Sequence, residues 1–302
     1  MAESALPFKA FDFPDVARVP MLSAERFLRE FKANARPVII EQMTTGWPAR
    51  ERWSLGYLRR VAGAAEVPVY DSVRSRDHKH QHAPAARMPL SAYLDRVEAG
   101  ESDLRLFFYN VLSGAPQLMA DFSFPDLGLR LFRKLPVLFI GGRGARVQMH
   151  FDIDWADLLL SHFGGRKRVL LFPPDQARAL YHVPFSFSSL GDIDYDAPDF
   201  DRFPALRKAR GCYAMLAHGE TLYIPPGWWH YIVYEDIGFS LTLRAFPRRL
   251  PEAAVMVRNL AVTRVIEGVM RALIGQAWND RNERLAVRRS HRALGLGQQG
   301  AG

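Results

Sequence analysis

Polar and apolar side chains alternate without a break between residues 146 and 155. A β-strand has a side-chain period of two, so a strand here places four polar residues on one face: Gln148, His150, Asp152 and Asp154. The intervening apolar residues occupy the opposite face. The pattern therefore predicts a strand on which His150 and Asp152 point the same way.

Other short runs also predict strands, at residues 37–40, 67–70, 104–110 and 239–246. Pro68 lacks a backbone N–H, which favours an edge position for its strand. Strict alternation puts Arg105, Phe107 and Tyr109 on one face of the third run. It likewise puts Thr242 and Arg244 on the polar face of the last run, together with Ser240.

Helices are expected before and after these strands. Ser23 and Ser54 are suitable N-caps for two short N-terminal helices. From residue 251 the apolar period becomes 3.6, with one stripe formed by Val262, Ile266, Val269 and Leu273, and a second helix is expected over 276–294. We therefore predict one β-rich domain over 1–250 and a helical extension over 251–302. The extension either joins the domain's own core or forms a homodimer interface.

His150 and Asp152 could hold one metal ion from one side, and a second histidine would complete a 2-His-1-carboxylate triad. Such a triad leaves coordination positions open and suits Fe(II). A lone His-X-Asp is common on half-exposed strands and is weak evidence by itself. His230 strengthens the case because two tryptophans and a Pro-Pro-Gly bend precede it and would restrict its orientation. His162 is an alternative ligand, although a structural histidine is the favoured interpretation.

Alternate histidines also occur at His78, His80 and His82. On a strand they could bind metal, but their charged neighbours and Pro84 are typical of a solvated loop. A flap at the mouth of a pocket is the preferred interpretation.

The triad, the segment 165–174 between its members and the Leu-Tyr-Ile-Pro run at 222–225 resemble the JmjC, cupin-like 2-oxoglutarate oxygenases. The likeness extends from Phe27 to Phe246 and is greatest to the branch of the asparaginyl hydroxylase that inhibits hypoxia-inducible factor. It implies a double-stranded β-helix, or jelly roll, with helices at both ends. It also implies Fe(II) on His150, Asp152 and His230, with 2-oxoglutarate and O2 as co-substrates.

The resemblance implies that Lys167 pairs with the distal carboxylate of 2-oxoglutarate. On strand period Lys167 shares a face with apolar residues, so its charge would be partly buried and would require an anion. The family tyrosine of this site falls on Phe107, so Tyr109 either replaces it or belongs to the core. Arg244, beside Thr242, falls near a family asparagine, and an arginine can bind a carboxylate through two hydrogen bonds.

Composition and charge limit the classes of site, cellular location and partner. The chain has 302 residues, of which 48% are hydrophobic, and a single cysteine, Cys212, which excludes an intramolecular disulfide and any multi-cysteine metal site. No signal-peptide core is evident, and charged residues interrupt the apolar run at 253–274, so we expect a cytoplasmic protein without a membrane segment. Of the net charge of +8, a net +6 lies between Arg248 and the end of the chain, from ten arginines and four acidic residues. RNA contact stays open on these grounds, although aromatic interleaving is absent there.

Together with these features, the resemblance implies an oxygenase that hydroxylates a protein side chain while 2-oxoglutarate is decarboxylated to succinate. An RNA hydroxylase acting on tRNA is the runner-up. A catalytically silent cupin-like module that presents its basic tail to a partner, and a zinc-dependent cupin isomerase or hydrolase, are further alternatives. The choice of substrate is expected to depend on the loops at 71–90 and 183–204.

Overall fold

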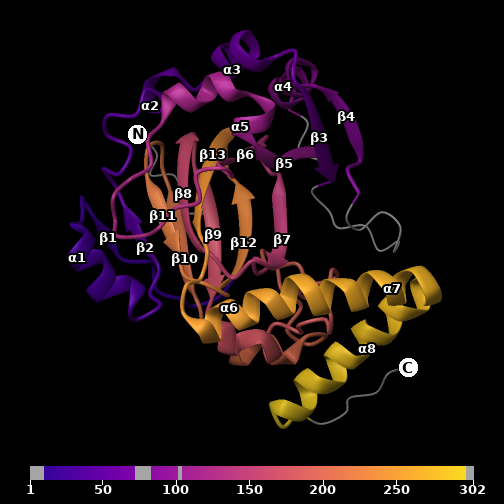
Figure 1. The fold of residues 1–302 in the computed structure, drawn as a ribbon. Coiled ribbons are helices and arrows are strands. Elements are labelled where there is room, and N and C mark those ends of the chain that lie inside the picture. The colour runs from indigo at the N-terminus through magenta and orange to yellow at the C-terminus, as the bar shows by residue number, and fades with distance from the viewer. Residues whose placement is uncertain (1–9, 72–82, 101–103, 297–302) are drawn as a thin grey trace, which may run out of the picture.

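The computed structural model describes residues 10–71, 83–100 and 104–296, and its described strands form two sheets (Figure 1). The larger sheet has nine strands, in the order β1 (Arg18–Val19), β2 (Val38–Ile40), β11 (Thr221–Ile224), β8 (Asp157–Gly164), β13 (Gly238–Ala245), β6 (Val137–Gly141), β5 (Leu104–Asn110), β3 (Glu66–Asp71) and β4 (Ala86–Pro89). The smaller sheet has four, in the order β10 (Cys212–Leu216), β9 (Lys167–Phe172), β12 (Trp229–Tyr234) and β7 (Arg146–His150).

The pairings between these strands are antiparallel, except for the parallel pair of β1 and β2. Strands that follow one another along the chain lie in different sheets. β8 pairs with β13 in the larger sheet, whereas β9, which comes directly after β8, pairs with β12 in the smaller sheet. This arrangement confirms the expected jelly roll with added helices.

Helices lie before the barrel, between its strands and after it. Their bounds are α1 Ala24–Phe27, α2 Ala49–Arg52, α3 Leu55–Ala62, α4 Leu90–Glu98, α5 Val111–Gly114, α6 Leu250–Val257, α7 Arg264–Ile274 and α8 Gln276–Ala293. π-helical turns continue α1 over Leu28–Lys32 and join α6 to α7 over Arg258–Thr263, and 3-10 turns occur at Pro116–Asp121, Pro174–Arg178 and Pro204–Lys208. Both predicted N-caps are confirmed, since the hydroxyl of Ser23 accepts from Arg26 N and that of Ser54 from Tyr57 N.

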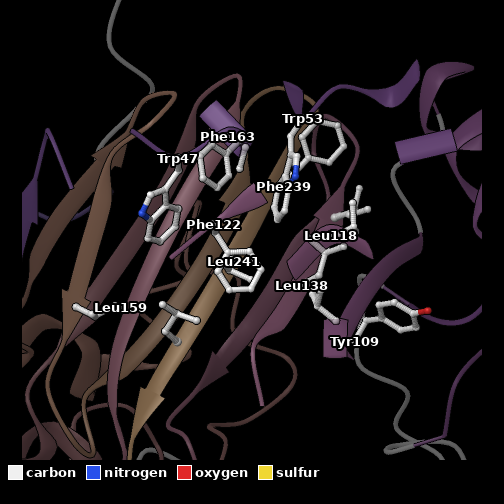
Figure 2. Close-up of a cluster of buried hydrophobic side chains, with 14 of the residues drawn as sticks. Trp47, Trp53, Tyr109, Leu118, Phe122, Leu138, Leu159, Phe163, Phe239 and Leu241 are labelled. Atoms are coloured by element: carbon white, nitrogen blue, oxygen red, sulfur yellow. The ribbon is translucent and has the colours of Figure 1, made fainter. Parts of the chain in front are cut away.

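Apolar side chains cover both faces of the central strands. The outer face of the nine-stranded sheet packs against the N-terminal helices in a cluster that includes Trp47, Trp53, Phe163 and Leu241 (Figure 2). A second cluster fills the space between the two sheets, and a third lies between the four-stranded sheet and the segments around residues 179–209. β8, β9, β11 and β13 are buried on both sides, and the central parts of β8 and β9 are accordingly continuous apolar runs.

Pro68 does not mark an edge strand, so that prediction is wrong. Its strand β3 lies between β4 and β5, and the edge strand is β4. The ladder between β3 and β5 includes Val69, Tyr70 and Asp71 but not Pro68. Pro68 pairs with Arg87 of β4 and lies just beyond the end of the ladder with β5, so its missing N–H does not interrupt that second ladder.

The C-terminal helices extend along one end of the barrel (Figure 1). Gly275, with a φ of 64°, separates α7 from α8, at the position expected from the sequence. Helix α8 returns to the domain, where Ala286 is buried and Tyr181 Oη lies 3.2 Å from His291 Nε2. Among the described residues no helix is long and apolar enough to cross a membrane. The division of the chain at residue 250 remains a prediction.

Candidate metal and co-substrate site

A pocket opens between the two sheets and contains about 470 Å³ of empty space, including its mouth. Its polar lining residues are His150, Asp152, Lys167, His230, Thr242 and Arg244, and the rest of its lining is aromatic or aliphatic. The structure therefore brings together six of the seven residues that the sequence singled out, from strands of both sheets and from the turn after β7.

Three of these residues form a cluster with the geometry of a metal site. One ligand atom from each of His150, Asp152 and His230 lies within 4.8 Å of the others. His150 and His230 face each other across the paired strands β7 and β12, with ring centroids 4.2 Å apart, and His150 Nε2 is 3.9 Å from Asp152 Oδ1. The donor set is two imidazoles and one carboxylate on one side, as Fe(II) sites with open positions require.

The hydrogen bonds of the two histidines leave Nε2 of each ring unprotonated and able to bind a metal. Nδ1 of His150 donates to Gln148 O at 2.8 Å, and Nδ1 of His230 donates to Trp228 O at 3.1 Å. Each Nε2 is then the unprotonated atom and points toward the cluster. Burial, followed by the neighbouring His230, lowers the pKa of His150 to about 3, and burial also lowers the pKa of His230. Both rings are therefore neutral near pH 7, and the three residues fit a divalent cation.

A β-bulge shapes this part of the pocket. Strand β7 ends at His150, and Asp152 lies in the turn that follows, so the predicted strand is too long. Between His150 and Val147 the pairing with β12 shifts by one residue, and both side chains line the pocket. Strict alternation, which separated Val147 from His150, is therefore wrong at this point, although His150 and Asp152 do lie on the same side as predicted.

Lys167 is buried in the pocket, with 1% of its surface exposed. Its Nζ donates to Ser240 Oγ and lies 3.9 Å from the centroid of the Tyr234 ring. Among the described residues no carboxylate forms an ion pair with it, and burial lowers the pKa of its ammonium well below the usual value. A buried cation without an anion is unfavourable, so the structure has a place for a carboxylate ligand beside Lys167.

His162 and Ser240 hold Lys167 from behind. His162 Nε2 is 3.0 Å from Gly165 O and its Nδ1 is 3.0 Å from Ser240 Oγ. A carbonyl only accepts, so the ring carries its proton on Nε2 and accepts the Ser240 hydroxyl proton at Nδ1; Ser240 in turn accepts from Lys167. A Cβ at Gly238 would lie 2.4 Å from His162 Cε1, so this glycine makes room for the ring. His162 is therefore part of the hydrogen-bond chain that ends on Lys167, and it does not belong to the cluster of His150, Asp152 and His230.

Arg244 binds the acidic turn that carries Asp152 and Asp154. Its Nη1 donates to Asp154 Oδ2 at 2.6 Å and lies 3.5 Å from Asp152 Oδ2. Burial alone would lower the pKa of Arg244, but these two carboxylates raise it. Arg244 together with the two histidines also lowers the pKa of Asp152, against the effect of burial. Asp152 is therefore ionised, with one oxygen toward the histidines and the other toward Arg244.

Tyr109 is the predicted site residue that the structure does not bring to the pocket. Strand β5 has an irregularity between Leu106 and Tyr109, and Phe108 there has a φ of 55°. This extra residue turns Tyr109 to the opposite face, where it belongs to the core cluster (Figure 2). Its ring occupies the space that a Cβ on Gly114 would need. Phe107 lines the pocket in its place, which favours the second of the two interpretations of Tyr109, a position in the core.

Two contributions to the site escaped the sequence reasoning. Asp154 was placed on the correct face, but nothing in the local pattern indicated that Arg244, far along the chain, would be its partner. Ser240 shares the polar face of its strand with Thr242 and Arg244, which was the available signal for its role. The cluster His78, His80 and His82 lies outside the described residues.

Comparison with known proteins agrees with this geometry. A family described as the cupin-like domain matches residues 24–252. The chain is 28% identical over 257 residues to tRNA wybutosine-synthesizing protein 5 of Gallus gallus, covering 78% of each chain. It is 28% identical to lysine-specific demethylase 8 of Xenopus tropicalis, covering 73% of this chain and 50% of that protein. It is 30% identical to lysine-specific demethylase JMJ30 of Arabidopsis thaliana, covering 75% of this chain and 54% of that protein.

The chain thus spans about half the length of these two demethylases and most of the length of the tRNA-named relative. The placement nearest the asparaginyl hydroxylase branch remains a prediction. The match to the family extends over the barrel and over all the pocket residues described above, and it confirms the resemblance inferred from the motifs. The chain belongs to the cupin-like JmjC domain family.

Proposed function

We propose that the protein is an Fe(II)- and 2-oxoglutarate-dependent oxygenase. The observation that carries the proposal is the joint presence, in one pocket, of a 2-His-1-carboxylate cluster and a buried lysine without an anionic partner among the described residues. When bound, Fe(II), O2 and 2-oxoglutarate would supply one oxygen atom for hydroxylation of a substrate and yield succinate and CO2. A zinc-dependent cupin hydrolase has no evident use for Lys167.

Four of the six polar lining residues are assigned a role in this reaction. His150, Asp152 and His230 hold the metal through Nε2, a carboxylate oxygen and Nε2. Lys167 binds the distal carboxylate of 2-oxoglutarate and so fixes its orientation, and Thr242 lies in the same pocket. The aliphatic walls contributed by Leu158, Leu160, Val147, Ile224 and Ile232 exclude water from the reacting region.

Turnover of 2-oxoglutarate tests the proposal directly. The full chain with Fe(II), ascorbate and O2 should convert 2-oxoglutarate to succinate, measured by mass spectrometry, and His150→Ala should abolish this conversion. His218→Ala is the matched control, because His218 is exposed and does not line the pocket. Normal succinate formation by His150→Ala would refute the proposal, and no formation by the unaltered chain would favour a catalytically silent binding module.

A protein side chain is the proposed substrate, and tRNA is the second candidate. The second candidate is favoured by the relatives named tRNA wybutosine-synthesizing protein 5, of which the chain covers about four fifths of the length, and by the arginines of α8. Incubating cell extract with the loaded enzyme and measuring both peptides and nucleosides separates the two. We expect a peptide heavier by one oxygen, whereas a modified nucleoside without a modified peptide would promote the RNA reading.

The salt dependence of RNA binding gives a second test. If the arginines of α8 contact phosphates, the logarithm of the association constant should fall linearly with the logarithm of the salt concentration, with a slope of about −0.7 for each contact to a single strand. We expect weak binding at all salt concentrations.

We also propose that the protein forms a homodimer through its C-terminal helices. Apolar side chains of α7 and the turn before it are exposed, including Val262 at 49%, Val265 at 57%, Val269 at 51% and Leu273 at 76%. Apolar stripes of this extent are usually covered by a partner. A cytoplasmic location is likewise our proposal.

A further inference from the structure

The charges of the pocket are unfavourable for a cationic substrate. Its charged lining residues, within the described part of the chain, are Lys167, Arg244 and the single carboxylate of Asp152. That carboxylate already faces His150 on one side and Arg244 on the other. No described lining carboxylate is therefore free to pair with an ammonium or guanidinium group, and a divalent metal on the triad would add further positive charge.

The aromatic lining is also engaged by the protein's own cations. Lys167 Nζ lies 3.9 Å from the ring centroid of Tyr234, and Arg244 Cζ lies 4.8 Å from that of Phe108. Arg105 Cζ lies 5.5 Å from the centroid of Phe107. Aromatic cages bind methylated ammonium groups through the negative ring face. Here a second cation on any of these three rings would meet a like charge across the ring.

Two donors on β13 have no partner. Nε of Arg244 and Oγ1 of Thr242 are buried and make no hydrogen bond to any described residue. Both residues line the pocket. The N–H at Arg244 Nε can only donate, and Asp154 holds the guanidinium in place through Nη1. A buried donor that is fixed in position and lacks a partner has an unmet requirement for an acceptor.

We infer that the substrate group entering this pocket is uncharged and carries a hydrogen-bond acceptor that binds Arg244 Nε, and that protonated or methylated amines are rejected. This inference rests on the proposed function and specifies its substrate class. It separates the chain from the chemistry stated in the names of its lysine-demethylase relatives. Thr242 supplies a second hydrogen bond on the same wall.

Small probes test this selection without knowledge of the natural substrate. The full chain is loaded with Mn(II) and N-oxalylglycine, an inert analogue of 2-oxoglutarate, and offered butyramide, n-butylammonium or tetramethylammonium at equal concentrations. Paramagnetic relaxation of the probe protons reports their approach to the metal. We expect at least roughly tenfold greater relaxation for butyramide, because one hydrogen bond to a charged donor by itself corresponds to about that factor.

Variants of Arg244 assign the selection to this residue. Arg244→Gln should remove most of the preference for butyramide, whereas Arg244→Lys, which keeps the charge, should still reject both cations. Because Arg244→Gln leaves the carboxylate of Asp154 buried without its partner, the double variant Arg244→Gln/Asp154→Asn serves as a second version with both charges removed.

The outcomes distinguish this inference from the proposed function. Equal relaxation by the three probes, stronger relaxation by either cation, or none by any probe overturns the inference. Succinate formation from 2-oxoglutarate by the Fe(II)-loaded chain is measured in parallel. Succinate formation with a preference for cations would leave the oxygenase standing and refute the selection. A butyramide preference without succinate formation would support the selection and refute the oxygenase.

Discussion

Replacing Lys167 with methionine should have opposite effects on the free protein and on ligand binding. Methionine has a similar length and no charge. In the free protein the ammonium is buried, lies against Tyr234 and has no anionic partner among the described residues, so its replacement removes an unfavourable charge. Exchange of buried charged groups for apolar side chains of similar volume is often neutral or stabilising by about 1–4 kcal/mol. We therefore expect unchanged or increased stability without ligand.

The effect on 2-oxoglutarate should be large and unfavourable. Without Lys167 the distal carboxylate would be buried with no cation, and removing one partner of a buried charge pair costs about 3–5 kcal/mol. This range corresponds to a dissociation constant weaker by about two to four orders of magnitude. Ser240 would keep its hydrogen bond to His162, so the wall behind the lysine should remain ordered.

Thermal unfolding with and without 2-oxoglutarate, in the presence of Mn(II), measures both effects. At a ligand concentration about 100 times its dissociation constant the unaltered protein, with its 302 residues, gains about 2.7 kcal/mol, or roughly 4 °C in Tm. Lys167→Met should lose this gain, and the exposed Lys134→Met should retain it. A lower Tm of ligand-free Lys167→Met, together with an undiminished ligand shift, would show that Lys167 is structural and that Arg244 is the next candidate anchor.

Three further predictions concern the metal, the hydrogen bond between Ser240 and Lys167, and the dimer. His230→Ala should remove most of the affinity for Mn(II) measured by calorimetry, because two donors rarely hold a metal where three are needed. Ser240→Ala should raise the KM for 2-oxoglutarate by roughly 2- to 13-fold with little change in kcat, since it removes one hydrogen bond from Lys167. Val269→Glu should convert a dimer into a monomer in light scattering, because it places a charge in the exposed apolar stripe.

Each of these has a contrary result. Undiminished metal binding by His230→Ala would mean that the ligand set is different. An effect of Ser240→Ala on kcat alone would separate Ser240 from co-substrate binding. A monomeric mass for the unaltered chain at micromolar concentration would show that the stripe on α7 does not join two copies.

The sequence alone identified the three clustered residues, His150, Asp152 and His230, because their orientation depends on local structure. His150 and Asp152 are two residues apart, so backbone geometry keeps their side chains on one side even though β7 ends at His150. His230 was marked by the rigid bend and bulky neighbours before it. The jelly roll and the lysine of the pocket followed from the order of several motifs along the chain, and the structure agrees with both.

Strand irregularities could be seen only in the tertiary structure. The extra residue in β5 turns Tyr109 into the core, and the shift in β7 places Val147 beside His150. Alternation along a sequence assumes a regular strand, whereas a bulge depends on which partner strand sets the register.

The tertiary fold also determined which residues distant in sequence form hydrogen bonds with each other. Arg244 and Asp154 are 90 positions apart, and Ser240 and His162 are 78 apart. No local period relates such residues, because they become neighbours only when β13 pairs with β8 and faces the turn after β7. The sequence therefore determined most of the polar side chains that line the candidate site. The packing of the two sheets determined which charges are already paired and which donors remain for a substrate.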